Sequence, residues 1–138
     1  MRLLAVLLTL LLPLIALPAA AQSLPDIPTL AVPPGTASGR LAAGGRDFYY
    51  VRAAALQALA VTVTSPGNEA IFQIYDPNTL VGRGGDGGIV ITGNPLPDAG
   101  PRTDAAAWLG VVPMGGLYLI VVASRGGATS YTLTISLQ

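Results

Sequence analysis

Residues 58–64 read Ala-Leu-Ala-Val-Thr-Val-Thr and residues 131–137 read Tyr-Thr-Leu-Thr-Ile-Ser-Leu, and these two stretches decide the fold class. In both, every second residue is large and apolar, and the residues between are Ala, Ser or Thr. Successive side chains of a β-strand point to opposite faces, so each stretch predicts a half-buried strand. Residues 116–123, Gly-Leu-Tyr-Leu-Ile-Val-Val-Ala, are apolar at every position after the glycine and predict a central strand.

Further strands are expected on both sides of these stretches, separated by Gly, Pro and Asn clusters that signal turns. They are predicted at residues 36–41, 47–53, 70–75, 89–92 and 107–111. No helix of ten or more residues is convincing in this part of the chain. The sequence therefore predicts an all-β fold, a single antiparallel, jelly-roll-like β-sandwich of about seven or eight strands.

The first 21 residues have the features of a cleaved signal peptide. Arg2 precedes a run of apolar residues that ends at Leu17, and Ala19 and Ala21 give the small-x-small pattern before a cleavage site. The run is shorter than the roughly 20 residues that span a membrane, so no stable membrane span is expected after cleavage. We expect a signal peptide at 1–21, a Pro-rich arm at 22–35, a β-sandwich domain at 36–138, and a periplasmic or secreted protein.

The composition argues against most enzyme classes. The chain has no His, no Lys and no Cys, so a serine nucleophile would lack its usual base and zinc its usual ligands. Six Arg and seven acidic residues remain after position 21, too balanced a charge for a nucleic-acid-binding protein. Asp76, Asp86 and Asp98 lie among turn residues and are expected to be solvated carboxylates rather than calcium ligands. We predict no enzyme activity, no catalytic residue, no cofactor and no metal.

Residues 82–87, Gly-Arg-Gly-Gly-Asp-Gly, match the dinucleotide-binding pattern G-x-G-x-x-G. That motif binds a pyrophosphate only where it joins a strand to the N-terminus of a helix. Residues 89–92 follow it and are strand-like, so a surface loop is predicted instead.

Four short motifs, in order along residues 33–137, resemble the bacterial pre-peptidase C-terminal domain family. They are Asp47-Phe48-Tyr49, Ala55-Leu56-Gln57, Gly116-Leu117-Tyr118 and Tyr131-Thr132-Leu133. Leu56 stands where that family has Gly. The resemblance implies a jelly-roll-like β-sandwich that acts as a non-enzymatic accessory of secreted peptidases, although no peptidase domain is attached here.

The same pattern is similar to that of the periplasmic inhibitors of g-type lysozyme. Their recognition loop resembles Leu-Pro-x-Ser-Gly-x-Tyr, and residues 112–118 read Val-Pro-Met-Gly-Gly-Leu-Tyr. Gly115 replaces the Ser whose hydroxyl, by this resemblance, would enter the lysozyme cleft. The candidate binding residues are Gly115, Gly116, Tyr118 and Arg125, with Tyr118 also a candidate to bond its hydroxyl to the backbone and Arg125 expected on a hairpin tip near Gly115.

The leading hypothesis is an exported binding or accessory module of the pre-peptidase C-terminal type, with a protein or a cell-wall glycan of the envelope as partner. The first alternative is a periplasmic lysozyme inhibitor that acts through the loop from Met114 to Tyr118, and the second is a structural cell-envelope protein. Nucleic acid is not expected as a partner.

Overall fold

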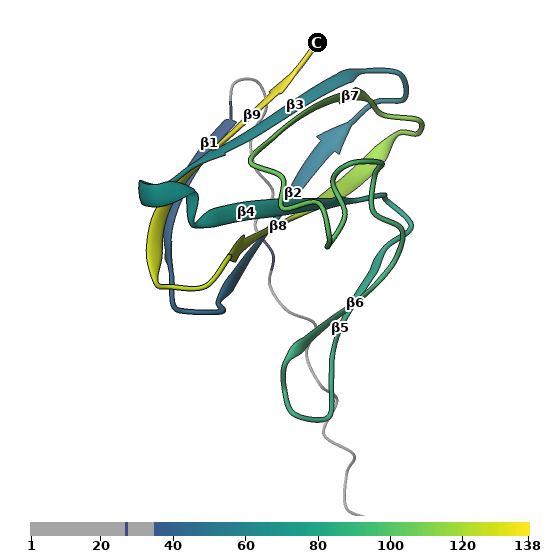
Figure 1. Ribbon diagram of the computed structural model, residues 1–138. Helices are drawn as coiled ribbons and strands as arrows, with labels where there is room; N and C mark the ends of the chain where they lie inside the picture. Colours follow the sequence, from purple (N-terminus) through teal and green to yellow (C-terminus); the bar gives the residue numbers. More distant parts are fainter. Residues whose placement is uncertain (1–26, 28–34) are drawn as a thin grey trace, which may run out of the picture.

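The computed structural model describes residue 27 and residues 35–138, and regular structure in that part of the chain is almost entirely β-strand (Figure 1). The only helical element there is a single 3-10 turn, Pro66–Asn68. Within the described residues no helix is long and apolar enough to cross a membrane. The expected signal peptide lies outside the described residues, as does most of the expected Pro-rich arm.

In the described part of the chain nine antiparallel strands form two main sheets and a separate hairpin, which confirms the predicted all-β class. The four-stranded sheet consists, in order, of β1 (Gly35–Leu41), β9 (Thr129–Leu137), β3 (Ala58–Thr64) and β7 (Ala107–Val111). The three-stranded sheet consists of β2 (Arg46–Ala53), β8 (Gly116–Ser124) and β4 (Ala70–Tyr75). The hairpin is formed by β5 (Leu80–Arg83) and β6 (Ile89–Thr92) and extends away from both sheets in Figure 1. Apart from the hairpin, each strand lies in the opposite sheet from the strand before it.

The main core lies between the two sheets, where the alternating patterns of the sequence meet. The apolar residues of β3 and β9 point inward, as predicted, and so do Phe72 and Ile74 of β4. From β8, Tyr118, Ile120 and Val122 enter the same core, and all three are fully buried. Burial of these side chains is the main stabilising contribution, because the chain has no disulfide.

A second, smaller cluster covers the outer face of the three-stranded sheet. Leu119 and Val121 of β8 and Tyr75 form its buried centre, and Val81 and Ile91 of the hairpin pack against them. Both faces of β8 are therefore buried, which confirms the predicted central strand. The hairpin is positioned by this apolar contact.

A partly buried hydrogen-bond network joins the two sheets at one end of the sandwich. The Tyr131 hydroxyl donates to Asp47 Oδ2 at 2.6 Å and lies 2.5 Å from the Tyr49 hydroxyl. Burial, together with these hydrogen bonds, raises the pKa of Tyr131 far above its usual value, so its hydroxyl stays protonated and donates. The ring lies across Gly39, where a Cβ would come within 2.7 Å of the Tyr131 hydroxyl oxygen. The network depends on a glycine at that position of β1.

Residues 82–87 run from the end of β5 into the turn of the β5–β6 hairpin and do not precede a helix. The turn is closed by the Gly84 N–H, which donates to the Gly88 carbonyl at 2.7 Å. Asp86 Oδ1 accepts a hydrogen bond from the Gly88 N–H at 2.9 Å, as Asp does in many turns. A strand follows the glycines, so the arrangement that a dinucleotide requires is not present in this segment.

Candidate functional site

The loop between β7 and β8, residues 112–115, is the centre of the candidate site. Val112 at its start is fully buried, whereas Pro113 and Gly115 are exposed and Met114 is half-buried. β8 begins at Gly116, which pairs with Ala53 at the end of β2. The loop therefore protrudes from one end of the sandwich while both of its ends are held by strands.

Tyr118 braces this loop from inside the core. Its ring is fully buried, and its hydroxyl donates to the Met114 carbonyl at 2.7 Å. The Met114 N–H points back at the same oxygen at 3.4 Å. Burial is the largest cause of the raised pKa of Tyr118, so the donating, protonated form persists at neutral pH. The structure places Tyr118 behind the loop, where it positions Met114 and does not itself reach the surface.

Position 116 requires a glycine because of both its backbone conformation and the lack of room for a side chain. Its φ of 149° lies in the region that L side chains rarely adopt, and an added Cβ would come within 2.7 Å of Pro77 Cβ. Pro77 belongs to the turn after β4, and Asn78 Nδ2 in the same turn lies 3.7 Å from Met114 Sδ. The β4–β5 turn therefore packs against one side of the loop.

Gly115 faces the turn between β2 and β3 on the other side of the loop. A Cβ at Gly115 would lie 3.5 Å from the Ala55 nitrogen and 3.7 Å from the Ala53 carbonyl oxygen, which are ordinary contacts. Gly115 is also outside the positive-φ region. A small side chain can therefore be added at Gly115 but not at Gly116.

Leu56 in the β2–β3 turn is a part of this end of the sandwich that sequence reasoning did not select. Its φ is 67°, a conformation that favours glycine, and its side chain is 78% exposed. The Leu56 N–H donates to the Val112 carbonyl at 2.8 Å, so the strained turn is bonded to the start of the loop. The observation that Leu56 stands where similar sequences have Gly was the one signal that could have drawn attention to it.

Arg125 lies at the opposite end of the molecule, so the expectation that it lies near Gly115 was wrong. Arg125 follows the last residue of β8, whereas Gly115 precedes the first, and a strand of this length separates them by about 25 Å. The nine residues of β8 keep the two positions apart whichever strand follows, and β9 in fact lies in the other sheet. The Arg125 N–H donates to the Glu69 carbonyl at 2.7 Å, and its side chain is exposed.

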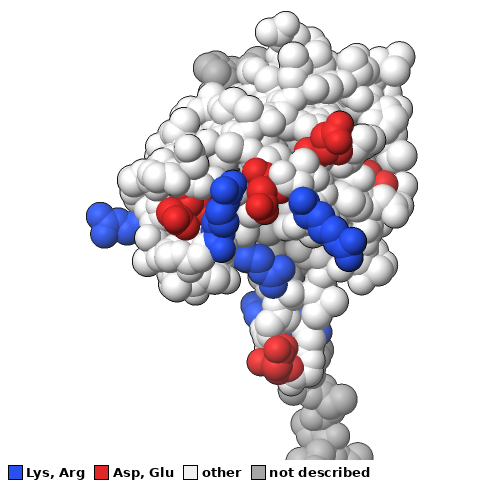
Figure 2. Space-filling view, in the orientation of Figure 1, with Lys and Arg blue, Asp and Glu red and all other residues white. Residues whose placement is uncertain are grey.

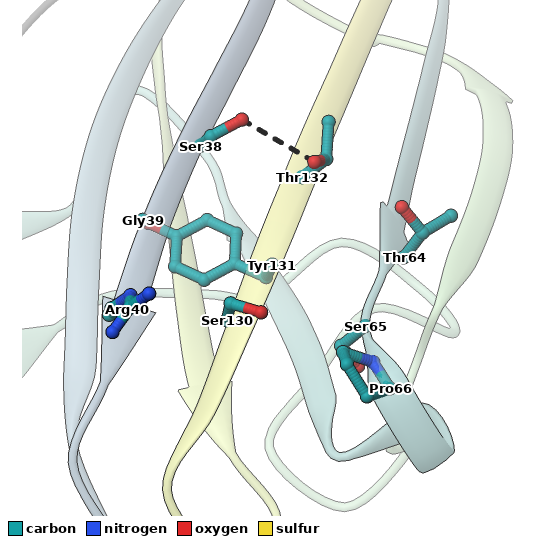
Figure 3. A pocket seen from close by; sticks show the side chains of 9 residues that line it. All are labelled: Ser38, Gly39, Arg40, Thr64, Ser65, Pro66, Ser130, Tyr131 and Thr132. Carbon is teal, nitrogen blue, oxygen red and sulfur yellow. Dashed lines mark hydrogen bonds between the residues drawn. The ribbon is translucent and has the colours of Figure 1, made fainter.

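A shallow groove of about 660 Å³ opens on the outer face of the four-stranded sheet (Figure 3). It is lined by residues of β1, of β9 and of the chain that leaves β3, namely Ser38, Gly39, Arg40, Thr64, Ser65, Pro66, Ser130, Tyr131 and Thr132. The Ser38 and Thr132 hydroxyl oxygens lie 3.4 Å apart across it. Thr64 is at the far end of β3 from the β2–β3 turn, so the groove is remote from the Pro113–Gly115 loop. None of these lining residues is acidic, and Arg40 is their single charged residue.

Asp76 and Asp86, which were expected in turns, accept hydrogen bonds from backbone N–H groups of their own turns. Asp76 Oδ1 accepts from the Asn78 N–H at 3.0 Å, and Asp98 is exposed with a φ of 61°. Among the described residues, no group of three or more acidic side chains is placed to hold a metal ion.

These features define a class of protein: a β-sandwich that presents a braced loop at one end. No family model matches the chain, and no curated protein matches it in sequence. Among the solved structures with a similar fold are three periplasmic lysozyme inhibitors of g-type lysozyme (PliG).

The inhibitor from Aeromonas hydrophila is 22% identical, with a TM-score of 0.56 over 81% of this chain and 95% of that chain. A mutant of the inhibitor from Escherichia coli is 13% identical, with a TM-score of 0.56 over 81% of this chain and 97% of that chain. The inhibitor from Salmonella Typhimurium is 15% identical, with a TM-score of 0.53 and the same coverage. At these identities the similarity is one of fold.

The expected membership of the pre-peptidase C-terminal domain family was wrong, and so was the accessory role inferred from it. No model of that family matches, and the similar structures are lysozyme inhibitors. The motifs behind the resemblance have structural roles that explain the error. Asp47 and Tyr131 join the two sheets, and Tyr118 braces a loop. These residues therefore indicate a β-sandwich fold and do not identify a particular family.

Proposed function

We propose that this chain is an exported inhibitor of a lysozyme of the g-type. In this proposal the exposed Pro113–Gly115 loop, which Tyr118 braces from behind, enters the sugar-binding cleft of the enzyme. The observation that carries the proposal is the match in fold to three such inhibitors, which covers 95–97% of their length. The similarity therefore extends over nearly the whole of those inhibitors and is not confined to one part of their fold.

The loop has the physical properties that such an inhibitor requires. It is narrow, because Gly115 and Gly116 carry no side chain, and it offers backbone N–H and C=O groups that can replace the hydrogen bonds of a sugar. The hydrogen bond from Tyr118 to Met114 restricts the loop before binding, and Pro113 restricts its own φ. Restriction in advance lowers the entropy that binding would otherwise lose.

Gly115 makes the proposed inhibition weaker than that of a loop with Ser at this position. A cleft carboxylate buried against the loop without a hydroxyl partner loses one hydrogen bond, which costs about 1–3 kcal/mol. That free energy corresponds to a roughly tenfold to hundredfold higher inhibition constant.

The expected chain boundaries are consistent with this function. A signal peptide at 1–21 would deliver the chain to the periplasm or beyond, where it would meet a lysozyme that enters the envelope. The Pro-rich arm at 22–35 and the domain at 36–138 would form the mature protein. The similar structures are those of periplasmic proteins.

A pull-down with three separate baits tests the proposal: a g-type lysozyme, a lysozyme of another type, and peptidoglycan. We expect retention on the g-type lysozyme, abolished by Gly115→Glu, whose Cβ has room in the loop and whose carboxylate brings a negative charge to the cleft carboxylates. Arg125→Ala, at the opposite end of β8, is the matched control and should be retained like the unmodified chain. Retention on peptidoglycan alone would replace lysozyme with a cell-wall glycan as the partner.

A further inference from the structure

β7 is an edge strand whose outer side has no backbone partner among the described residues. It pairs only with β3. Just before β7 the Ala106 carbonyl accepts from the Val63 N–H, and just after it the N–H and C=O of Val112 bond to the β2–β3 turn, so all of these bonds lie on the β3 side. Backbone groups alternate in direction along a strand, so the even-numbered residues face β3. The N–H and C=O groups of Ala107, Leu109 and Val111 therefore point away from the sheet.

The other edges of the two sheets are covered or charged. The outer edge of β4 is bonded to the segment before β7, through Phe72 to Ala105 and Ile74 to Ala99. β1 carries Arg40, and β2 carries Arg46 and Arg52. Native proteins use such cover and charge to prevent edge-to-edge pairing.

β7 lacks both forms of protection. Residues 105–124 contain no charged side chain, and residues 53–68, which include its neighbour β3, contain none either. In Figure 2 the visible basic side chains lie across the middle of the view and on the hairpin below, and none is visible in the upper part, where Figure 1 places β7. Leu109 and Val111 are 75% and 62% exposed, and they lie opposite Ala60 and Ala58 of β3 on the outer face of the sheet. The result is an open, uncharged edge next to an apolar surface.

We propose that β7 is the interface of a homodimer, in which the β7 strands of two copies pair antiparallel about a twofold axis at Leu109. The two four-stranded sheets would then become one continuous sheet, joined by about six backbone hydrogen bonds between Ala107, Leu109 and Val111 of each copy. Pairing would satisfy the outward backbone groups and cover the exposed side of Leu109.

The size pattern of β7 favours a second copy over an unrelated strand. With Leu109 on the axis, Ala107 lies opposite Val111 and Trp108 lies opposite Gly110, so a small residue faces a larger one on each side of the sheet. The Trp108 ring already lies over Gly110 of its own strand, where a Cβ would come within 2.5 Å of it. An uncharged strand also meets its own copy without repulsion between like charges. Because the two β7 strands run antiparallel, the two Pro113–Gly115 loops lie at opposite ends of the paired strands. Both loops therefore stay accessible.

Cysteine cross-linking tests the register directly, because the natural chain has no cysteine. In the proposed dimer the two Leu109 Cα atoms are about 5.5 Å apart, within the range that a disulfide spans. We expect Leu109→Cys to form a disulfide-linked dimer under mild oxidation. Thr36→Cys, on the exposed face of the opposite edge strand β1, is the control for random collision and should remain monomeric. Equal cross-linking of the two variants would overturn the proposal.

Sedimentation analysis of the purified chain over a range of micromolar concentrations is the second arm. We expect a dimer whose dissociation constant rises roughly a hundredfold or more in Leu109→Lys, because two like charges then meet on the axis. Leu109 is exposed, so the melting temperature of the diluted monomer should not change. A chain that is monomeric at every concentration, or a dimer unaffected by Leu109→Lys, would overturn the proposal, as would a stable complex only with a strand of another protein.

Discussion

Replacing Gly115 by Ser should strengthen lysozyme inhibition without disturbing the fold. The added Cβ meets the Ala55 nitrogen at 3.5 Å and the Ala53 oxygen at 3.7 Å, so no neighbour has to move. Gly115 is not at positive φ, so a side chain is not strained there. Loss of a glycine also lowers the entropy of the unfolded chain, which adds about 0.4–1 kcal/mol to the free energy of unfolding.

The gain in inhibition follows from a single hydrogen bond. A hydroxyl that pairs with a buried cleft carboxylate recovers about 1–3 kcal/mol that the natural loop leaves unmade. The inhibition constant should therefore fall by roughly tenfold to a hundredfold. Gly115→Ala adds the same Cβ without the hydroxyl and should leave the inhibition constant close to that of the natural chain.

The assay is the inhibition constant of the three proteins against one g-type lysozyme, with thermal melting measured in parallel. The comparison of Ser with Ala isolates the hydroxyl from the effect of the Cβ on the loop. If Gly115→Ser and Gly115→Ala inhibit equally, the hydroxyl has no partner in the cleft and the assumed placement of the loop is wrong.

Three further predictions concern stability. Gly116→Ala should lower the free energy of unfolding by about 1–3 kcal/mol, because of its φ and the contact with Pro77; a urea midpoint equal to that of the natural chain would refute the strain. Leu56→Gly should raise the free energy of unfolding by up to about 1 kcal/mol, since it relieves a left-handed Leu; thermal melting checks this, and a lower melting temperature would contradict it. Burial raises the pKa of Tyr131 above its usual value of 10.0, so the stability it contributes is fully present below pH 10 and falls as the pH rises further, when the tyrosines of the unfolded state ionise first. Urea midpoints at pH 8 and above pH 10 should show this fall, and Tyr131→Phe should reduce it.

The strands could be predicted from the sequence because their signal is local. The alternation in 58–64 and 131–137 gave both the presence of β3 and β9 and the face of each that enters the core. The apolar residues on both faces of β8 likewise predicted its central place, which the hairpin and the main core together explain.

Pairing between strands could not be predicted in the same way. Residues 124–127, Ser-Arg-Gly-Gly, signal a turn, but a turn signal does not tell whether the next strand pairs with the last one or crosses to the other sheet. The chain crosses to the other sheet at this turn. Arg125 is far from Gly115 because the nine residues of β8 lie between them. The bonds from Tyr131 to Asp47 and Tyr49 join residues more than eighty positions apart, and no local pattern encodes such a contact.

The candidate site was only partly accessible from the sequence. The loop was found by its similarity to a recognition motif, and Tyr118 was correctly expected to bond its hydroxyl to the backbone. Leu56 was not found, because its turn contains neither Gly nor Asn at the position that takes a positive φ. The open edge of β7 depends on which strand pairs with which, so it became visible only in the folded chain.

The central claim is tested most directly by the lysis of a bacterial cell-wall suspension by a g-type lysozyme, followed by turbidity as the purified natural chain is added. The account predicts that lysis slows progressively with concentration and stops at saturation, and that lysis by a lysozyme of another type is slowed much less. Undiminished lysis by the g-type enzyme at saturating concentrations of a folded chain would contradict it.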